Sequence, residues 1–387
     1  MGHYHSGEGQ HIEQTVKEFC ENKIRKNWSK FVKDKCFSRE VLEKMGELGF
    51  LGAMIPEAYG GAGMSMQEYV VLMESLACYG GGSIALTLTA HHSLAAAHII
   101  YAGTEEQKRT FLPKLASGEM IGAWCLTEPD AGSDAFGKGM KTIATPDNYC
   151  WNISGTKQFI TNGSIADVYV VIAKTAGDEK NSGAFIVPKY WEKIIQRKKG
   201  FIQHCPETNK IGMHASDTSA VVFDGVELSA EAKMEGDGKE STYKVLNNGR
   251  VGISALACGL MRSALSEAVT YAKERKSFGK AIADYQGVSF PLADASSELS
   301  SSWAIIEKAA LAADRGILTP KLAAETKLKV TKATFEGCLT ALQVFGGAGY
   351  MLESRVAQDF CDALLLRIGE GTDNMQRLAI AKSLFSL

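Results

Sequence analysis

The sequence predicts an α+β protein in which a helical region, a strand-rich region and a second helical region follow one another. Apolar residues recur at three- and four-residue intervals before about residue 120 and again from about residue 240 onward. Between these regions, short β-branched and aromatic runs favour strands. The sequence has no internal repeat. We therefore expect three domains, covering residues 1–120, 121–232 and 233–387, with helices and strands in segregated layers.

Helical periodicity characterises the first region. It is clear in residues 41–50 and 66–78, and the Pro- and Gly-containing stretch 54–65 separates these helices. Residues 84–100 are mostly apolar and predict a buried helix that carries three histidines, His91, His92 and His98. No acid accompanies them at ligand spacing, so we interpret them as core or pocket-wall residues rather than metal ligands.

The middle region, from Ile121 to Leu228, predicts a small and mostly antiparallel β domain. Its strand signals are the runs ADVYVVIAK and SAVVFDGVEL and the strand-and-turn sequence SGTKQFITNGS. After it the helical period returns, and one long helix is marked by Ile253, Leu256, Leu260 and Ala264. We expect this helix to stop at Gly279, and further helices over residues 285–315, 320–345, 355–365 and 373–385.

Composition excludes several classes of function. The chain has 387 residues, is 45% hydrophobic and has a formal net charge of -2, so no electrostatic feature favours nucleic acid. No apolar run is long enough to span a membrane. The nine scattered cysteines include no CxxC pair, which argues against a disulfide framework or a zinc site and favours a reducing compartment.

Two stretches in the middle region have side chains suited to a polar or aromatic ligand. Residues 123–134 (AWCLTEPDAGSD) join a strand to a compact turn whose amides and hydroxyls can face a ligand. In residues 157–164, Phe159 and Thr161 share one strand face and suit the plane and edge of a flat ring. Taken alone, residues 123–134 are better explained as an ordinary strand and turn, and core packing with a cap explains residues 157–164 nearly as well.

Two stretches in the last region could contact phosphate groups. In residues 271–280 (YAKERKSFGK), Arg275 and Ser277 could hold a pyrophosphate, or the basic residues could simply complement a helix C-terminus. Residues 343–350 (QVFGGAGY) form a glycine-rich break that could cradle a dinucleotide. They lack the preceding strand that a Rossmann fingerprint requires.

One carboxylate near the C-terminus is the candidate for catalysis. Glu370 lies between Gly369 and Gly371, just before a helix that is expected to begin near Asp373. One interpretation is purely structural, because an acid before a helix N-terminus complements the helix macrodipole. Its two glycine neighbours also leave room for a ligand to approach the carboxylate and the backbone.

Taken together, these motifs resemble the flavin-dependent acyl-CoA dehydrogenase family. The matching pieces follow the family's order and span about residues 50–381: IPEAYGGAG, LTEPDAGSD, FITNG, MHASDTSAVVFDGVEL, LNNGR, ERKSFGK, QVFGGAGY and IGEGTDNMQRL. The resemblance implies an N-terminal helical domain, a middle antiparallel β domain and a C-terminal four-helix-bundle domain. It also implies one FAD per subunit, usually in a homotetramer.

The resemblance implies roles for individual residues. Residues expected to contact the flavin ring are Trp124, Leu126, Thr127, Ser133, Phe159, Thr161, Thr372 and Asn374. Residues expected to reach the FAD of a neighbouring subunit, or to cradle its adenosine diphosphate, are Arg275, Ser277, Phe278, Gln286, Gln343, Gly346 and Gly347. Residues expected on the substrate side are Ser133, Arg250, Gly369 and Gly371.

The resemblance also implies that Glu370 is the catalytic base. A minority of the family takes its base from the helix near Arg250, where this chain has Gly249, which cannot act as one. Removing a proton α to a thioester needs a desolvated carboxylate with a pKa near neutrality, and the developing oxyanion needs donors. The resemblance suggests the backbone N–H of Glu370 and a ribityl hydroxyl of FAD as those donors, with the β-hydride passing to the flavin.

Gly369 bears on the substrate. Many members have a tyrosine there, so the glycine predicts a larger acyl pocket and a branched, cyclic or bulky acyl group, unless a neighbouring helix refills the space. No arginine occurs between Arg39 and Arg109, so a distal substrate carboxylate would lack a partner, and a dicarboxylic acyl group is not expected.

The predicted reaction is α,β-dehydrogenation of an acyl-CoA to the trans-2-enoyl-CoA, with an electron-transfer flavoprotein as acceptor. Alternatives within the family are an acyl-CoA oxidase and an acyl-carrier-protein dehydrogenase. From another class, a non-catalytic acyl-CoA-binding scaffold would bind no flavin. The expected location is the bacterial cytoplasm or, for a eukaryotic protein with its transit peptide removed, the mitochondrial matrix.

Overall fold

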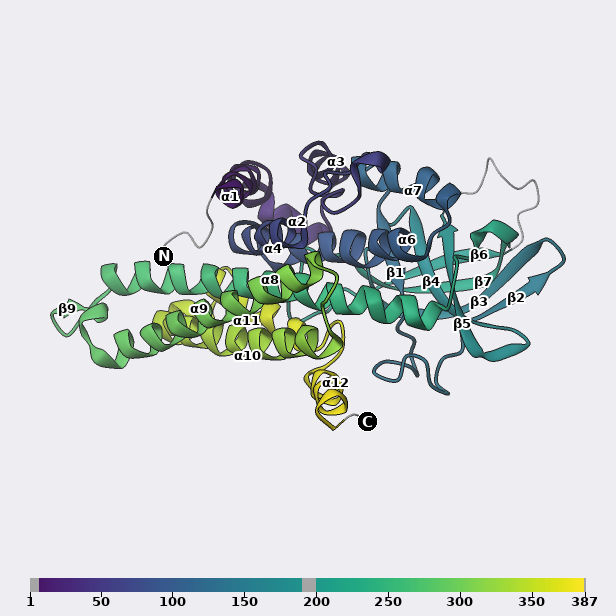
Figure 1. Ribbon diagram of the computed structural model, residues 1–387. Coiled ribbons are helices and arrows are strands. Elements are labelled where there is room, and N and C mark those ends of the chain that lie inside the picture. The colour runs from purple at the N-terminus through teal and green to yellow at the C-terminus, as the bar shows by residue number, and fades with distance from the viewer. Residues whose placement is uncertain (1–6, 190–199, 386–387) are drawn as a thin grey trace.

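A computed structural model describes residues 7–189 and 200–385, and its three regions follow the predicted order (Figure 1). The N-terminal helices are α1 (Glu8–Phe19), α2 (Trp28–Asp34), α3 (Arg39–Glu47), α4 (Met66–Ser75), α5 (Gly82–Leu88), α6 (Ala97–Ala102) and α7 (Glu105–Ser117). A π-helical segment, η5 (Thr89–Ala96), joins α5 to α6, so the predicted buried helix over residues 84–100 is continuous but irregular. Thr104 and Gln107 form a capping box that begins α7.

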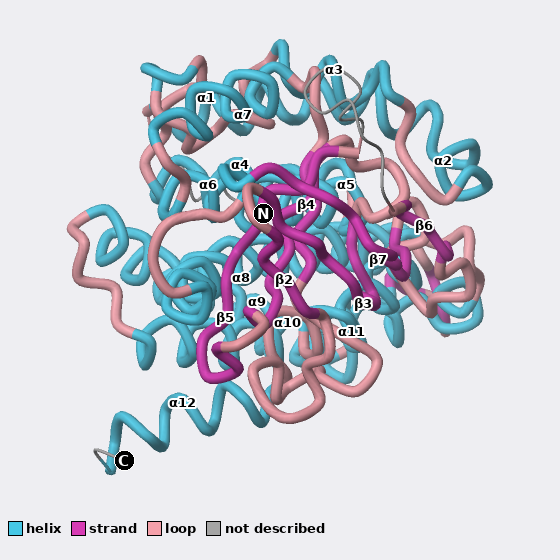
Figure 2. Tube along the Cα trace, turned by 90° about the vertical axis from the view of Figure 1, so that its right-hand side faces the viewer, coloured by secondary structure: helices cyan, strands magenta, loops and turns pink. Residues whose placement is uncertain are grey.

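The described strands of the middle region are β1 (Gly122–Cys125), β2 (Ile143–Asp147), β3 (Cys150–Thr161), β4 (Val168–Thr175), β5 (Asp178–Pro188), β6 (Phe201–Pro206) and β7 (Thr218–Ser229). They form a sheet of order β1-β4-β2-β3-β7-β6, with β5 also paired to β4. Four strand pairs are antiparallel, whereas β4 pairs in parallel with β1 and β2. Figure 2 shows this sheet in front of the helices of both helical regions.

Four long helices build the C-terminal bundle: α8 (Gly238–Glu274), α9 (Gln286–Asp314), α10 (Pro320–Phe345) and α11 (Arg355–Leu366). Helix α8 packs against α4 of the N-terminal region as well as against α9, α10 and α11. Arg262 of α8 fixes the α8–α4 contact, since it forms a bidentate ion pair with the buried Glu74.

Helix α8 ends at Glu274, earlier than the sequence predicts. Arg275 is its C-cap, and the chain continues into a two-stranded hairpin, β8 (Lys276–Ser277) and β9 (Lys280–Ala281). Gly279 lies in the hairpin turn with a φ of 87°. The glycine therefore serves the turn and not the helix stop, because the hairpin needs the positive φ that glycine adopts at low cost.

The last helix, α12 (Asp373–Phe385), projects away from the rest of the chain (Figures 1 and 2). Of its described residues only Gln376 is buried, and Leu378, Leu384 and Phe385 are exposed. Several apolar side chains of this helix are thus exposed on the single chain.

The three histidines near residue 90 are buried, and their rings hydrogen-bond segments that are distant in the sequence. Each ring accepts a hydrogen bond through one nitrogen and faces an oxygen through the other. His98, for example, accepts from the Trp124 indole at 3.0 Å and contacts the Ser241 hydroxyl at 2.9 Å. Burial lowers the pKa values of His91, His92 and His98 to about 4, 3 and 4, so all three are neutral at pH 7.

Candidate active site

Glu370 lies in the loop between α11 and α12 and has a left-handed backbone, with a φ of 54°. This conformation is uncommon for a residue with a side chain and persists only where the surroundings hold it. Two buried side chains hold it here. Lys327 Nζ donates to the Gly371 carbonyl at 2.7 Å, and Gln376 Nε2 donates to the same oxygen at 2.8 Å.

The Glu370 carboxylate is buried and unpaired. Neither oxygen has a hydrogen-bond partner among the described residues. Burial raises the pKa of Glu370 to about 7, against the opposing influence of the Lys327 and Arg250 charges. Because the two protonation states are close in free energy at neutral pH, this carboxylate can take up and release a proton there.

Gly249 of α8 makes room for that carboxylate. A Cβ atom at this position would lie 2.4 Å from Glu370 Oε2 and 3.1 Å from Cδ. Any side chain would therefore displace the glutamate. The sequence indicated that Gly249 cannot supply a base, and the structure adds that its missing side chain lets Glu370 lie against α8.

Arg250 lies beside the same loop. It is buried, and its Nη1 donates to Asn247 Oδ1 at 2.9 Å, while its Nε has no partner among the described residues. Its Nη2 lies 3.9 Å from the position that a Cβ of Gly371 would occupy. The bond to Asn247 thus fixes the guanidinium against its own helix, and its Nε–H can still donate a hydrogen bond.

Two stretches that carry predicted ring-contacting residues lie next to each other near the end of β3. Gln158 N–H donates to the Thr127 carbonyl at 2.8 Å, and Lys157 Nζ donates to the Leu126 carbonyl at 3.0 Å. These bonds place Leu126 and Thr127, which follow β1, alongside residues 157–158 of β3. Phe159 is 61% exposed, so its ring can accept a ligand.

The end of β3 is less regular than the sequence predicts. Phe159 has a φ of 58°, and the pairing of β3 with β7 shifts register between Lys157 and Ile160. Phe159 and Thr161 therefore do not alternate as they would in a regular strand. Ser133 is exposed in the loop after β1.

The remaining predicted residues fall into two groups. Gly369, Gly371, Thr372 and Asn374 surround Glu370 in sequence, on its loop and the first turn of α12. The other group lies at the opposite end of the bundle (Figure 1): Arg275, Ser277, Phe278, Gln286, Gln343, Gly346 and Gly347. Stacking of Tyr271 on Phe345, with ring centroids 4.2 Å apart, joins the ends of α8 and α10 there.

Helix length keeps these two groups apart within one chain. Arg250 and Arg275 are both at α8, so the helical rise separates them by roughly 37 Å. Most residues of the far group are exposed, Ser277 is half-buried, and the Phe278 side chain is 95% exposed. The two predicted groups are therefore not neighbours within one chain.

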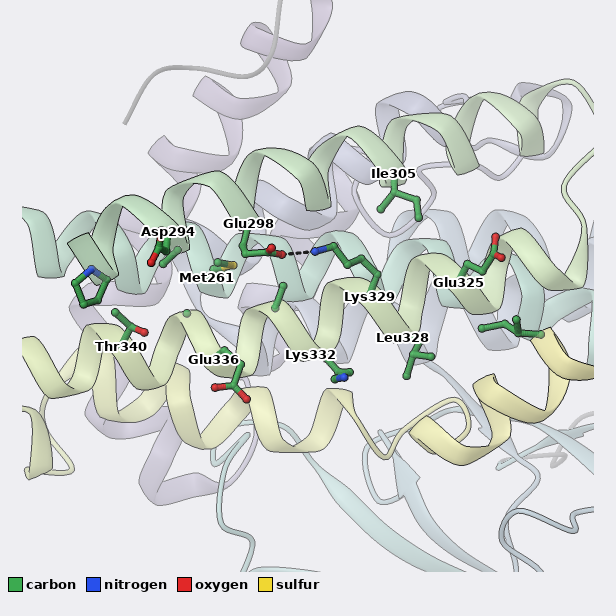
Figure 3. Close-up of a pocket in the computed structure, with 15 residues that line it drawn as sticks. Met261, Asp294, Glu298, Ile305, Glu325, Leu328, Lys329, Lys332, Glu336 and Thr340 are labelled. Carbon is green, nitrogen blue, oxygen red and sulfur yellow. Dashed lines mark hydrogen bonds and ion pairs between the residues drawn. The ribbon is translucent and has the colours of Figure 1, made fainter. Parts of the chain in front are cut away.

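A groove of about 730 Å³ lies elsewhere, between α9 and α10 (Figure 3). Its floor includes Met261, and the Glu298–Lys329 ion pair crosses it. The residues that line it include none of the predicted site residues. No group of three or more potential metal ligands occurs in the described part of the chain.

The Glu370 carboxylate is thus buried among helices of the N- and C-terminal regions, and comparison with known proteins identifies the class of enzyme. Family models described as the acyl-CoA dehydrogenase N-terminal, middle and C-terminal domains match residues 6–119, 123–226 and 236–385. The chain therefore belongs to the acyl-CoA dehydrogenase family, which confirms the predicted family, fold class and class of enzyme.

Two relatives illustrate the similarity in sequence. An acyl-CoA dehydrogenase of Bacillus subtilis is 36% identical over 378 residues, covering 96% of this chain and 97% of the relative. The CarC subunit of the caffeyl-CoA reductase–Etf complex of Acetobacterium woodii is 32% identical, covering 98% of each.

Two solved structures illustrate the similarity in fold. Butyryl-CoA dehydrogenase of Megasphaera elsdenii superposes with a TM-score of 0.91 at 33% identity, covering 100% of each chain. A glutaryl-CoA dehydrogenase of Mycobacterium smegmatis in complex with FADH2 superposes with a TM-score of 0.91 at 29% identity, covering 99% of this chain and 96% of the other. The latter complex supports the predicted cofactor, FAD.

Sequence reasoning missed two residues of the site, Lys327 and Gln376. A signal for the lysine existed, because it occupies a buried stripe of α10 at helical spacing with Ala323, Ala324, Val330 and Thr331. A lysine on an apolar helix face is uncommon unless it has a partner. Gln376 carried no comparable signal, since no other described residue of α12 is fully buried and a glutamine on a helix is usually solvent-facing.

Proposed function

We propose that this protein catalyses α,β-dehydrogenation of an acyl-CoA thioester to the trans-2-enoyl-CoA, with Glu370 as the base that removes the α-proton. The observation that carries the proposal is the buried Glu370 carboxylate, unpaired among the described residues, with a pKa raised to about 7. A carboxylate of this kind is strong enough to accept a weakly acidic α-proton and is not committed to a structural partner.

The backbone next to Glu370 can stabilise the negative charge that develops on the thioester carbonyl oxygen. When the α-proton moves to a Glu370 oxygen, negative charge grows on the thioester carbonyl and needs donors aimed at it. The backbone N–H of Glu370 makes no hydrogen bond within the described residues, so it is free to donate there. FAD, when bound, accepts the hydride from the β-carbon.

The residues present are consistent with FAD. Phe159 offers an exposed ring that the isoalloxazine could cover, and the neighbouring Gln158 is hydrogen-bonded to Thr127. In the far group, Cβ atoms at Gly346 and Gly347 would meet no heavy atom within 4 Å, so that surface is open to a ligand. We infer that Arg275, Ser277 and Gln286 bind the FAD of a neighbouring subunit, within a homotetramer.

We also propose a branched, cyclic or bulky acyl group. A Cβ atom at Gly369 would meet only the Leu365 carbonyl oxygen, at 3.6 Å, so the space next to this backbone position is open. No arginine lies between Arg39 and Arg109 to pair with a distal carboxylate, which argues against dicarboxylic substrates.

An electron-transfer flavoprotein is the proposed acceptor, in keeping with the relative that belongs to an Etf complex. None of the described helices is both long and apolar enough to cross a membrane. All nine cysteines are free, which favours a reducing compartment, and we propose the cytoplasm. We retain domain boundaries at residues 120/121 and 232/233 as part of the proposal.

The decisive experiment compares wild-type protein with Glu370→Gln. Anaerobic mixing with a panel of straight, branched and cyclic acyl-CoA thioesters measures how fast each bleaches the flavin. The variant should bind FAD normally and lose nearly all flavin reduction, because glutamine cannot accept the proton. Normal reduction in the variant refutes Glu370 as the base, and faster reduction by butyryl- to octanoyl-CoA than by every branched or cyclic thioester refutes the acyl-group proposal.

A further inference from the structure

We propose that Lys327 is a positioning residue for the dehydrogenation: its ammonium holds the Gly371 carbonyl so that the Glu370 carboxylate faces the substrate unpaired. The inference rests on the proposed role of Glu370 as the base. It assigns a function to a side chain on α10, a helix that carries no other part of the reaction centre.

The burial of Lys327 is the first observation. The residue lies in the middle of α10 with no exposed surface. Lysine is rarely buried unless its ammonium has partners, because desolvation of the charge is costly. The bond from Nζ to the Gly371 carbonyl, at 2.7 Å, reaches across to the glutamate loop and supplies one partner.

A second donor reaches the same backbone from another helix. Gln376 of α12 donates to the carbonyls of Gly371, at 2.8 Å, and Glu370, at 3.3 Å. Lys327 and Gln376 together fix the two peptide groups next to the glutamate, and so maintain its left-handed backbone. This backbone decides where both the carboxylate and the Glu370 N–H point.

The hydrogen-bond partner of Lys327 affects the basicity of Glu370. If its ammonium paired directly with the Glu370 carboxylate, the ion pair would lower the pKa of the glutamate and weaken it as a base. Instead the bond goes to a carbonyl, and both carboxylate oxygens stay without a partner among the described residues. The lysine therefore contributes a nearby positive charge without occupying the base.

The charged and titratable groups around Glu370 come from four helices. Lys327 of α10 and Arg250 of α8 lower the pKa of Glu370, whereas burial raises it. The Tyr69 hydroxyl of α4 is also within electrostatic range. Burial lowers the pKa of Lys327 to about 8, while Glu370 and Asp373 of α12 raise it, so the lysine is mostly charged at pH 7.

The test uses three variants of the FAD-bound protein. Lys327→Met removes the bond and the charge, Gln376→Met removes a neutral donor to the same carbonyl, and Lys332→Met is the control for an exposed lysine of the same helix. Two readouts are followed from pH 5 to 9: the anaerobic rate of flavin reduction by the best thioester, and the infrared band of the protonated Glu370 carboxyl, identified by its absence in Glu370→Gln.

In Lys327→Met, the infrared titration of Glu370 should move to higher pH by about one unit, as loss of a nearby positive charge requires. The reduction rate at pH 7 should then fall at least five-fold, because about that share of the deprotonated base is lost. In Gln376→Met the rate should fall at every pH with little change in the titration. Lys332→Met should match wild type in both readouts.

Two outcomes overturn the inference. One is a Lys327→Met protein that is folded, binds FAD and matches wild type in both rate and titration while Glu370→Gln is inactive. The other, available if Lys327→Met does not fold, is a Gln376→Met protein with an unchanged rate. If Glu370→Gln itself reduces flavin normally, the proposed base has failed instead, so the two failures are distinguishable.

Discussion

A methyl group at Gly249 should slow the reaction on the order of 100-fold without destabilising the protein. In Gly249→Ala the new Cβ would lie 2.4 Å from Glu370 Oε2 and 3.3 Å from Oε1, whereas ordinary contacts begin at 3.4 Å. The carboxylate would have to move by about 1 Å. A misplacement of this size costs on the order of 100-fold in rate when the group must meet a reacting atom in near-attack geometry.

The folding of the variant should not suffer. Gly249 lies inside α8 and does not have a positive φ, so alanine fits the backbone and favours the helix by about 1 kcal/mol. Strain from the displaced carboxylate offsets part of this gain. We therefore expect a melting temperature close to that of wild type, together with a much slower reaction.

Stopped-flow measurement of anaerobic flavin reduction, with the best thioester of the panel, gives the rate. Gly369→Ala is the matched control, because its Cβ would meet only the Leu365 carbonyl oxygen, at an ordinary 3.6 Å. That variant should reduce flavin within a few-fold of the wild-type rate. A Gly249→Ala protein that reduces flavin as fast as wild type would refute the close packing of Glu370 against α8.

Two further predictions concern FAD binding and stability. Arg275→Ala should lose FAD and tetramer together, measured by flavin absorbance and sedimentation, whereas Lys273→Ala on the same helix end should not; unchanged FAD content would contradict an intersubunit contact. Burial raises the pKa of Glu370 from 4.5 to about 7, so the folded state retains a proton that the unfolded state releases in this window. Wild type should therefore lose up to about 3 kcal/mol relative to Glu370→Gln between pH 4.5 and 7, and equal slopes of stability against pH would contradict the buried carboxylate.

Much of the architecture was predictable because it depends on local patterns. Helices α10 and α12 begin and end where the sequence predicts, since Thr319 caps α10 with Pro320 in its first turn and Asp373 opens α12. The end of α8 was mispredicted for a local reason as well. A glycine can end a helix or form a hairpin turn, and Gly279 alone does not say which.

The site was predictable in part. Glu370 and the middle-domain residues Trp124, Thr127 and Phe159 were proposed from motifs, and the structure pairs the backbone of residues 126–127 with residues 157–158. The irregular backbone at Phe159 was not foreseen, because a register shift between β3 and β7 depends on the pairing of two distant strands.

The sequence by itself determined the order of the domains, the helix and strand periods, and the family with its expected base and cofactor. Only the tertiary structure decided that Gly249 lies against the Glu370 carboxylate and that Lys327 and Gln376 hold the loop beside it. The physical reason is that periodicity and turn preferences act between near neighbours in the chain. The pKa of a carboxylate and the space around it depend instead on side chains that folding brings from distant helices.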